Sequence, residues 1–169
     1  MTEPLWPSIA ILAFVTLQRL TELPIAAANT RRLLARGGTE VGASHYPLIV
    51  ALHAAWLGAL WWFALGRPIN FAFLALFVLV ELGRVWVLRT LGPRWTTRII
   101  VVPGEALVAA GPYRFVNHPN YLVVIAEIAV LPLVFGLWQI ALVFSLLNAA
   151  VLAIRVRAEN RALGAAQRG

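Results

Sequence analysis

The sequence predicts an all-α integral membrane protein, and three observations lead to this fold class. Of the 169 residues, 61% are hydrophobic and only 12% are charged, a balance typical of membrane proteins rather than soluble domains. The apolar residues gather into long segments. The fourteen positive charges are all arginines and lie mostly between these segments or just after them, as expected for the loops of membrane proteins.

Five hydrophobic segments are predicted to be transmembrane helices. A helix rises about 1.5 Å per residue, so a span needs roughly 20 residues, and the last two segments are shorter than that. These two are predicted to form a short helical hairpin that turns at residues 135–137, with a re-entrant pair as the alternative. The segments cover about Trp6 to Ala28, Tyr46 to Leu65, Ile69 to Leu91, Tyr121 to Phe135 and Leu137 to Ile154.

The five segments and the connections between them are predicted to form a single membrane domain over residues 1–169. Because Pro132 and Gly136 weaken the end of the fourth segment, that helix could also stop short of the far surface. Residues 92–120 form the longest loop, and its apolar stretches are expected to lie against the membrane. Residues 155–165 have a helix-forming composition and are predicted to extend the last helix into the cytoplasm.

Arginine placement predicts the orientation of the chain. Basic clusters follow the first, third and fifth segments, whereas the alternate loops hold only Arg67 or no arginine. Cytoplasmic loops of membrane proteins are enriched in positive charge, so an odd number of spans, with the N-terminus outside and the C-terminus inside, is expected. The clusters are Arg31, Arg32 and Arg36; Arg89, Arg94, Arg98 and Arg114; and Arg155, Arg157, Arg161 and Arg168.

Several functions and features are excluded or disfavoured by composition. No basic stripe with interleaved aromatic residues suggests a nucleic-acid partner, and the absence of cysteine excludes thiolate chemistry. His45, His53 and His118 do not form a zinc-binding pattern, so no metal is predicted. His53 is expected to pack between helices through one hydrogen bond. The N-terminus lacks the basic start of a cleavable signal, so the first segment is expected to be retained.

Charged residues inside the predicted spans are costly and usually face a bundle interior or a water-filled cavity. Arg19 and Glu22, and likewise Glu81 and Arg84, are three residues apart and share a helix face. Each pair either satisfies itself, locks two helices together or lines a cavity open to the cytoplasm. Glu127 has no partner at helical spacing in its own segment, which leaves three alternatives: protonation, pairing with an arginine of another helix, or a place near the active site.

Residues 111–121 are the densest polar and turn-forming run of the chain and lie directly before an apolar segment. The run reads Gly-Pro-Tyr-Arg-Phe-Val-Asn-His-Pro-Asn-Tyr. Its prolines and glycine restrict the backbone, while its tyrosines, arginine, histidine and asparagines supply hydrogen bonds, a cation and aromatic faces. This inventory predicts chemistry at a membrane surface.

The spacing of these motifs resembles the isoprenylcysteine carboxyl methyltransferase family. Leu107-Val108 is followed by Gly111-Pro-Tyr113, then by His118-Pro-Asn-Tyr121, and after a helical hairpin by Arg157-Ala-Glu159, so the resemblance covers most of the C-terminal half. Within the family, the chain looks closest to a bacterial branch linked to O-methylation of alkylpyrones or alkylresorcinols. This likeness rests on the Gly-Pro-Tyr-Arg start of the loop motif, the Glu-Asn-Arg-Ala-Leu sequence after the last segment and residues 91–98.

The resemblance implies S-adenosylmethionine as the methyl donor and a lipophilic acceptor that reaches the site from the bilayer, among membrane lipids. The donor is expected on the cytoplasmic side, between the loop and the end of the last helix. Arg155 or Arg157 would orient the acceptor oxygen. Donor contacts are predicted for Leu107, Val108, Tyr113, His118, Pro119, Asn120, Tyr121 and Glu159.

Two departures from the family pattern keep other functions open. Asn117 stands where an arginine usually precedes His-Pro, and Asn160 stands where a second glutamate is common. The predicted reaction is methyl transfer to a carboxylate, phenol or hydroxypyrone oxygen, with isoprenylcysteine carboxyl methylation or phospholipid-type N-methylation as alternatives. A non-enzymatic alternative is a small transporter or assembly factor, in which Glu22, Glu81 and Glu127 form a polar path.

Overall fold

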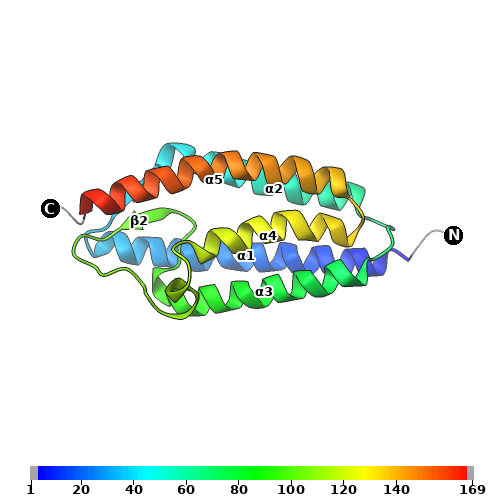
Figure 1. The fold of residues 1–169 in the computed structure, drawn as a ribbon, viewed down its shortest axis with the longest axis horizontal. Helices are drawn as coiled ribbons and strands as arrows, with labels where there is room; N and C mark the ends of the chain where they lie inside the picture. The colour runs from blue at the N-terminus through cyan, green and yellow to red at the C-terminus, as the bar shows by residue number, and fades with distance from the viewer. Residues whose placement is uncertain (1–3, 167–169) are drawn as a thin grey trace.

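A computed structural model describes residues 4–166, with side chains described as far as Arg161. Five long helices run roughly along one axis (Figure 1). Short 3₁₀ turns, η1 (Ala43–His45), η2 (Gly92–Arg94) and η3 (Gly111–Arg114), punctuate the connections. The helices are α1 (Trp6–Ala35), α2 (Tyr46–Phe63), α3 (Phe71–Leu91), α4 (Pro119–Val134) and α5 (Trp138–Ala166).

The all-α membrane class predicted from the sequence is confirmed, whereas the number of spans stays a prediction. Helices α1, α2, α3 and α5 are long and apolar enough to cross a membrane. Helix α4 has only 16 residues, which corresponds to about 24 Å against a hydrocarbon core of about 30 Å. The first helix continues to Ala35 rather than ending at Ala28, and α5 runs without a break from Trp138 to Ala166.

Helix α4 is the central element of the bundle and packs between α3 and α5 (Figure 1). Its second half is almost completely enclosed, with Glu127, Leu131 and Val134 all buried. The N-terminus and the α4–α5 turn lie at one end of the bundle, while the long loops and the C-terminal end of α5 lie at the other. The second half of the short helix is therefore shielded from lipid by its longer neighbours.

Local sequence signals explain where the helices begin and end. The Asn70 side chain caps α3 by accepting hydrogen bonds from the backbone N–H groups of Ala72 and Phe73, at 3.1 and 3.2 Å. Proline stands at the first position of α4, where no backbone donor is needed. Gly136, with φ +67°, makes the left-handed turn between α4 and α5.

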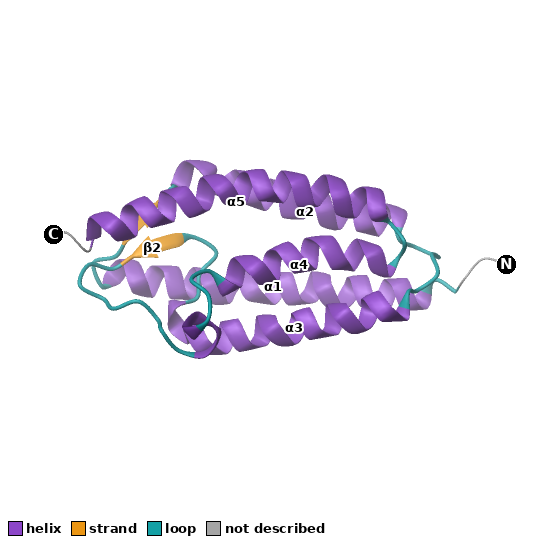
Figure 2. Ribbon diagram, viewed as in Figure 1, coloured by secondary structure: helices purple, strands orange, loops and turns teal. Residues whose placement is uncertain are grey.

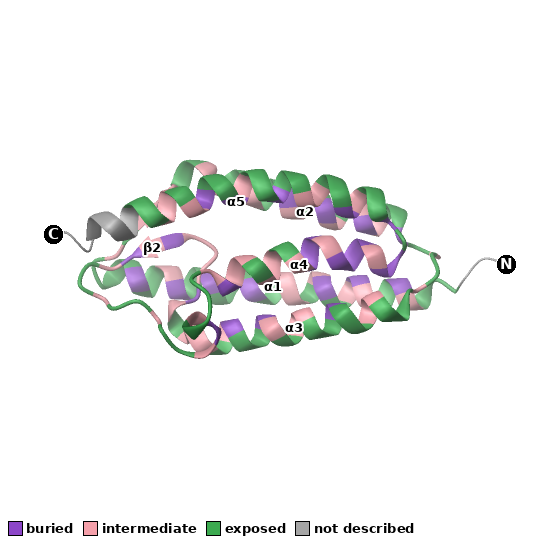
Figure 3. Ribbon diagram, in the orientation of Figure 1, coloured by how far each residue is buried: buried purple, intermediate pink, exposed green. Residues whose placement is uncertain are grey.

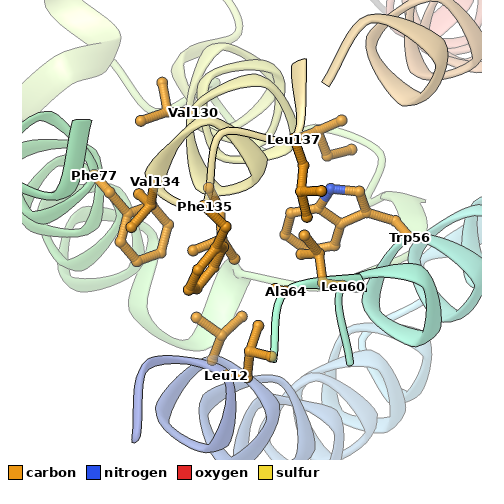
Figure 4. Packing of buried hydrophobic residues seen from close by; sticks show 12 residues of the cluster. Leu12, Trp56, Leu60, Ala64, Phe77, Val130, Val134, Phe135 and Leu137 are labelled. Carbon is orange, nitrogen blue, oxygen red and sulfur yellow. The ribbon is translucent and has the colours of Figure 1, made fainter. Parts of the chain in front are cut away.

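The outer faces of the helices are apolar and exposed, the reverse of a soluble protein (Figure 3). Trp62, Phe71 and Leu146 are 80%, 76% and 65% exposed. Exposed apolar surfaces of this kind are typical of helices that contact lipid. The buried apolar cluster gathers near the α4–α5 turn, where Phe135 and Val134 contact the neighbouring helices (Figure 4).

A small antiparallel sheet, which the sequence analysis did not predict, joins the two loops at the opposite end (Figure 2). Strand β1 (Thr39–Val41) pairs with β2 (Ile99–Val101) in the register Glu40 opposite Ile100. Ile99 and Val101 are buried, so this apolar stretch of the long loop is covered by protein. The sheet ties the loop after α3 to the end of α1.

Candidate active site

A wide cavity of about 640 Å³ lies between the loop after α3 and the C-terminal part of α5; we call it the loop cavity. Pro119, also predicted to contact the donor, is instead buried as the first residue of α4. Seven of the eight residues predicted to bind the methyl donor line the loop cavity: Leu107, Val108, Tyr113, His118, Asn120, Tyr121 and Glu159.

The start of α4 brings the polar motif of the loop against α5. The rings of His118 and Tyr121 stack with centroids 5.3 Å apart. The Tyr121 hydroxyl donates to Glu159 Oε2 at 2.5 Å, and His118 Nδ1 lies 3.7 Å from the same oxygen. The loop motif and the tail of α5, distant in sequence, therefore form one hydrogen-bonded cluster.

Arg155 is the second anchor between the loop and α5. Its Nε donates to the Tyr121 hydroxyl at 3.0 Å, and its terminal nitrogen donates to the Thr97 carbonyl at 2.7 Å. Arg155 is only 6% exposed, whereas Arg157 is exposed and lines neither this cavity nor the one described below. Of the two predicted orienting arginines, only Arg155 therefore faces a cavity in the described residues.

Gly111 and Tyr113 belong to the 3₁₀ turn η3. Gly111 has φ +53°, and a Cβ atom there would collide with the Thr90 side chain, so only glycine fits. Burial, followed by the negative charge of Glu159, raises the pKa of Tyr113 to about 12. The Tyr113 hydroxyl is therefore protonated at physiological pH and is available as a donor.

A second cavity of about 300 Å³ lies inside the helix bundle; we call it the bundle cavity. Its lining is predominantly apolar and comes from all five long helices. Leu23 of α1 and Val50 of α2 belong to this lining and are 51% and 48% exposed, so the cavity reaches the outer surface between these helices. Five residues line both cavities: Trp95, Thr96, Asn120, Tyr121 and Arg155.

Buried charges at the wall of the bundle cavity are paired across helices. Arg84 of α3 donates to Glu22 of α1 at 2.7 Å and to Glu127 of α4 at 2.9 and 3.0 Å. Arg19 also binds Glu127, at 2.5 Å, and lies 3.5 Å from Glu22. Of the three alternatives for Glu127, pairing with arginines of other helices is the arrangement observed.

Of the alternatives for Glu81 and Arg84 on α3, a pair that satisfies itself is not formed in the described residues. Arg84 instead joins helices and lines the bundle cavity. Arg84 turns toward the carboxylates of α1 and α4, while Glu81 accepts a hydrogen bond from Gln18 at 2.6 Å. The spacing of three residues places both side chains on one helix face, but two carboxylates from other helices offer Arg84 a more complete set of partners.

The two-stranded sheet helps to fix the segment before β2, which contributes Trp95 and Thr96 to both cavities. Arg98, directly before β2, donates to both carboxylate oxygens of Glu40 at 2.7 and 2.9 Å. Its guanidinium also lies 4.4 Å from the ring centroid of Tyr46 at the start of α2. The segment that carries Trp95 to Thr97 is thus fixed to β1 and α2, and through Arg155 to α5.

Comparisons with known proteins identify the family. The isoprenylcysteine carboxyl methyltransferase family model matches residues 73–165, which include the loop motif, α4 and most of α5. The chain belongs to this family. An uncharacterized protein, YpbQ, of Bacillus subtilis is 36% identical over 166 residues, covering 90% of this chain and 94% of its own. An uncharacterized protein of Haemophilus influenzae is 25% identical, covering 86% and 88%. No solved structure matches.

Membership of the isoprenylcysteine carboxyl methyltransferase family makes the chain an integral membrane methyltransferase. The sequence did not reveal three parts of the site: the cross-helix pairing of Arg84, the Trp95–Thr97 wall and Asn148 in the bundle cavity. Isolated polar residues in apolar segments were the available signal for Arg84 and Asn148. Nothing in the local sequence of Trp95 distinguishes it from an interfacial anchor.

Proposed function

We propose that the protein transfers a methyl group from S-adenosylmethionine to an oxygen atom of a lipophilic acceptor drawn from the bilayer. The observation that carries this proposal is that the two cavities share a wall. Tyr121 and Arg155 line both cavities. A polar cofactor and an apolar acceptor can each occupy a cavity of suitable chemistry and meet there.

The loop cavity fits the methyl donor in size and chemistry. About 640 Å³ falls within the range of about 300–1,000 Å³ usual for ligand sites. Glu159 offers a carboxylate to the ammonium or ribose of the donor, and Leu107 and Val108 offer apolar contacts to its adenine. Tyr113, kept protonated by its raised pKa, donates a hydrogen bond.

The bundle cavity fits the acceptor. The exposed side chains of Leu23 and Val50 at its edge support entry from the lipid between α1 and α2. A carboxylate or a hydroxypyrone or resorcinol-type hydroxyl would reach Arg155 with the alkyl chain still in the apolar part. The alkylpyrone or alkylresorcinol class inferred from the motif resemblance belongs to this proposal.

The protein contributes to the reaction by aligning the two reactants and by supplying a positive charge. When bound, S-adenosylmethionine supplies an electrophilic methyl group, whose bond to sulfur breaks as the bond to the acceptor oxygen forms. Arg155 favours the ionised oxygen, which matters most for a phenol with a pKa of about 10. Tyr121 and Arg155 fix the line of approach, and positioning of this kind can supply several kcal/mol. We expect the covering loop and sheet to exclude water once both ligands are bound.

The same proposal includes the orientation. The basic residues at the end of α1 and in the C-terminal part of α5 lie at the end of the bundle that carries the sheet and the loop cavity. Positive charge favours the cytoplasmic side, where the soluble donor is found. The N-terminus is then outside and the C-terminus inside, with α4 as the fourth of five crossings.

The transporter alternative loses its main support. Glu22 and Glu127, two of the three carboxylates that would form a polar path, are held by Arg84 and Arg19. Isoprenylcysteine carboxyl methylation and phospholipid-type N-methylation remain as distinct acceptor classes, which labelled acceptors of each type would separate.

Equilibrium binding of S-adenosylmethionine to the purified protein in detergent tests the proposal. We expect saturable binding that weakens at least about tenfold in His118→Ala and Glu159→Gln, because each loses a polar contact to the donor. The matched control is His45→Ala, since His45 lines neither cavity. Absence of saturable binding to the parent protein, or equal binding by the parent and both cavity variants, would overturn the assignment.

A further inference from the structure

The bundle cavity contains two hydrogen-bonding side chains that the proposed methyl transfer does not use. Asn148 of α5 is only 2% exposed and lines this cavity. Within the described part of the chain its amide forms no side-chain hydrogen bond, although a buried amide without a partner is costly. His53 of α2 lines the same cavity.

The hydrogen bond of His53 fixes what its ring can offer to a ligand. His53 Nδ1 lies 2.8 Å from the carbonyl oxygen of Ile49. A carbonyl only accepts, so Nδ1 carries the proton, and in the neutral ring Nε2 is then an acceptor. Among the residues whose side chains are described, 4–161, the only hydrogen bond of the His53 ring is the one at Nδ1.

The charged groups that face the same cavity are already engaged. Glu22 and Arg84 bind each other, and Arg84 and Arg19 both bind Glu127. Thr97 shares a hydrogen bond with the Tyr46 hydroxyl at 3.1 Å. Trp56 Nε1 and Arg19 Nε also lack a partner among the described residues, but both atoms are enclosed by protein and can only donate. The remaining hydrogen-bonding capacity in the membrane part of the cavity lies on His53 and Asn148.

We propose that His53 and Asn148 bind a hydroxyl group of the acceptor, separate from the oxygen that is methylated. This inference rests on the proposed function, because it takes the bundle cavity as the acceptor site. An Nε2 acceptor requires a ligand that donates, while an amide can donate to the lone pairs of the same group. A hydroxyl meets both requirements, whereas a hydrocarbon chain meets neither.

The position of Asn148 places this hydroxyl deeper in the bundle than the reacting oxygen. Asn148 precedes Arg155 by two helical turns on α5, a separation of about 10 Å along the axis. A ring with two hydroxyl groups, hydrogen-bonded at both ends, spans a distance of this order. The two side chains thus select an acceptor whose ring carries a second polar group.

A binding measurement without the methyl donor tests the inference. The probes are a long-chain 5-alkylresorcinol and the 3-alkylphenol with the same chain, which lacks one hydroxyl. Binding to the full-length protein in lipid nanodiscs is followed by intrinsic fluorescence, because Trp56 and Trp95 line the cavity. We expect the resorcinol to bind about tenfold more tightly, since leaving buried polar groups unpaired costs at least this factor.

Single substitutions assign the preference to the two residues. Asn148→Leu and His53→Leu should each reduce the preference to about twofold or less, while Gln139→Leu, an exposed position on α5 outside the cavity, should retain it. Equal affinities for the two probes in the parent protein, or an unchanged preference in both cavity variants, would overturn the inference.

The outcome separates this inference from the proposed function. Saturable binding of S-adenosylmethionine without a resorcinol preference leaves the methyltransferase assignment in place and removes the role of His53 and Asn148. A resorcinol preference without binding of the donor does the reverse. Retained S-adenosylmethionine binding in each variant shows that the variant has folded.

Discussion

The half of the bundle near the α4–α5 turn and the half near the two-stranded sheet bury different kinds of group. The first, the apolar half, is packed with side chains such as Leu131, Phe135 and Leu60, each at most 1% exposed (Figure 4). The second, the cavity half, holds the two cavities and the buried charges around Arg84. The boundary falls within one turn of α4, between Glu127 and Leu131.

The difference separates stability from chemistry. Close packing in the apolar half holds the helices together without polar groups that must find partners in lipid. In the cavity half, charges are costly unless they are paired, and we propose that this region serves the reaction. Substitutions should therefore sort into those that unfold the protein and those that impair ligand binding.

The largest expected effect comes from Arg84→Leu, which breaks the charge network in the cavity half. It leaves Glu22 and Glu127 without their shared partner, and removing one member of a buried ion pair costs about 3–5 kcal/mol. Denaturant unfolding in detergent measures the loss. The exposed Arg67 at the other end provides the control, since Arg67→Leu should change the stability by less than about 0.5 kcal/mol. Equal stability of the two variants would show that the network is not structural.

A smaller loss of stability is expected from Leu131→Ala in the apolar half. The substitution leaves a cavity at a fully buried position, and such changes cost about 2–5 kcal/mol. The folded fraction should bind S-adenosylmethionine with the parent affinity, because the loop cavity is untouched. Leu146→Ala, on the lipid-facing side of α5, is the matched control with little expected change. Weakened donor binding by folded Leu131→Ala would break the division between the halves.

Tyr121→Phe should show the opposite pattern. It removes the hydroxyl that links Arg155 to Glu159, and a hydrogen bond to a charged group contributes about 1.5–3 kcal/mol. We expect methyl transfer to fall at least about tenfold, with a loss of unfolding free energy of no more than about 3 kcal/mol. Rates of transfer and unfolding curves of the same preparation measure both. A large loss of stability without a loss of rate would assign Tyr121 to the scaffold.

The smallest effect is a pH dependence. The pKa of Tyr113 is raised to about 12 by burial, against about 10 in an unfolded chain. A raised pKa stabilises the folded state fully below pH 10 and less as the pH rises from about 10 to 12. Comparison of the parent with Tyr113→Phe should therefore give parallel stability curves from pH 7 to 9, and a steeper decline of the parent above pH 10. Divergence of the curves below pH 9 would contradict a protonated Tyr113.

The sequence predicted the helices well because the membrane imposes their length and polarity. The loop motif and Glu159 could also be connected in advance, since a short hairpin must bring the end of α5 back to the start of α4. Donor contacts at these residues stay predictions, although the residues do line one cavity.

The sequence could not specify which side chains pair between helices. Arg84 has a carboxylate three residues away on its own helix, yet it binds Glu22 and Glu127 because the helices rotate their polar faces toward one another. The pairing of Glu40 with Ile100 in the small sheet likewise depends on how α1 and the loop meet in space. Such contacts follow from packing, which local periodicity does not encode.

The central claim is that donor and acceptor meet at the wall shared by the two cavities. Transfer of a labelled methyl group from S-adenosylmethionine to a long-chain alkylresorcinol, catalysed by the protein in nanodiscs, tests it most directly when Arg155→Met and Arg157→Met are compared. Arg155 lines both cavities, and Arg157 lines neither. We expect Arg155→Met to lose at least about tenfold in rate and Arg157→Met to retain at least half of it. Equal losses, or a larger loss in Arg157→Met, would contradict the claim.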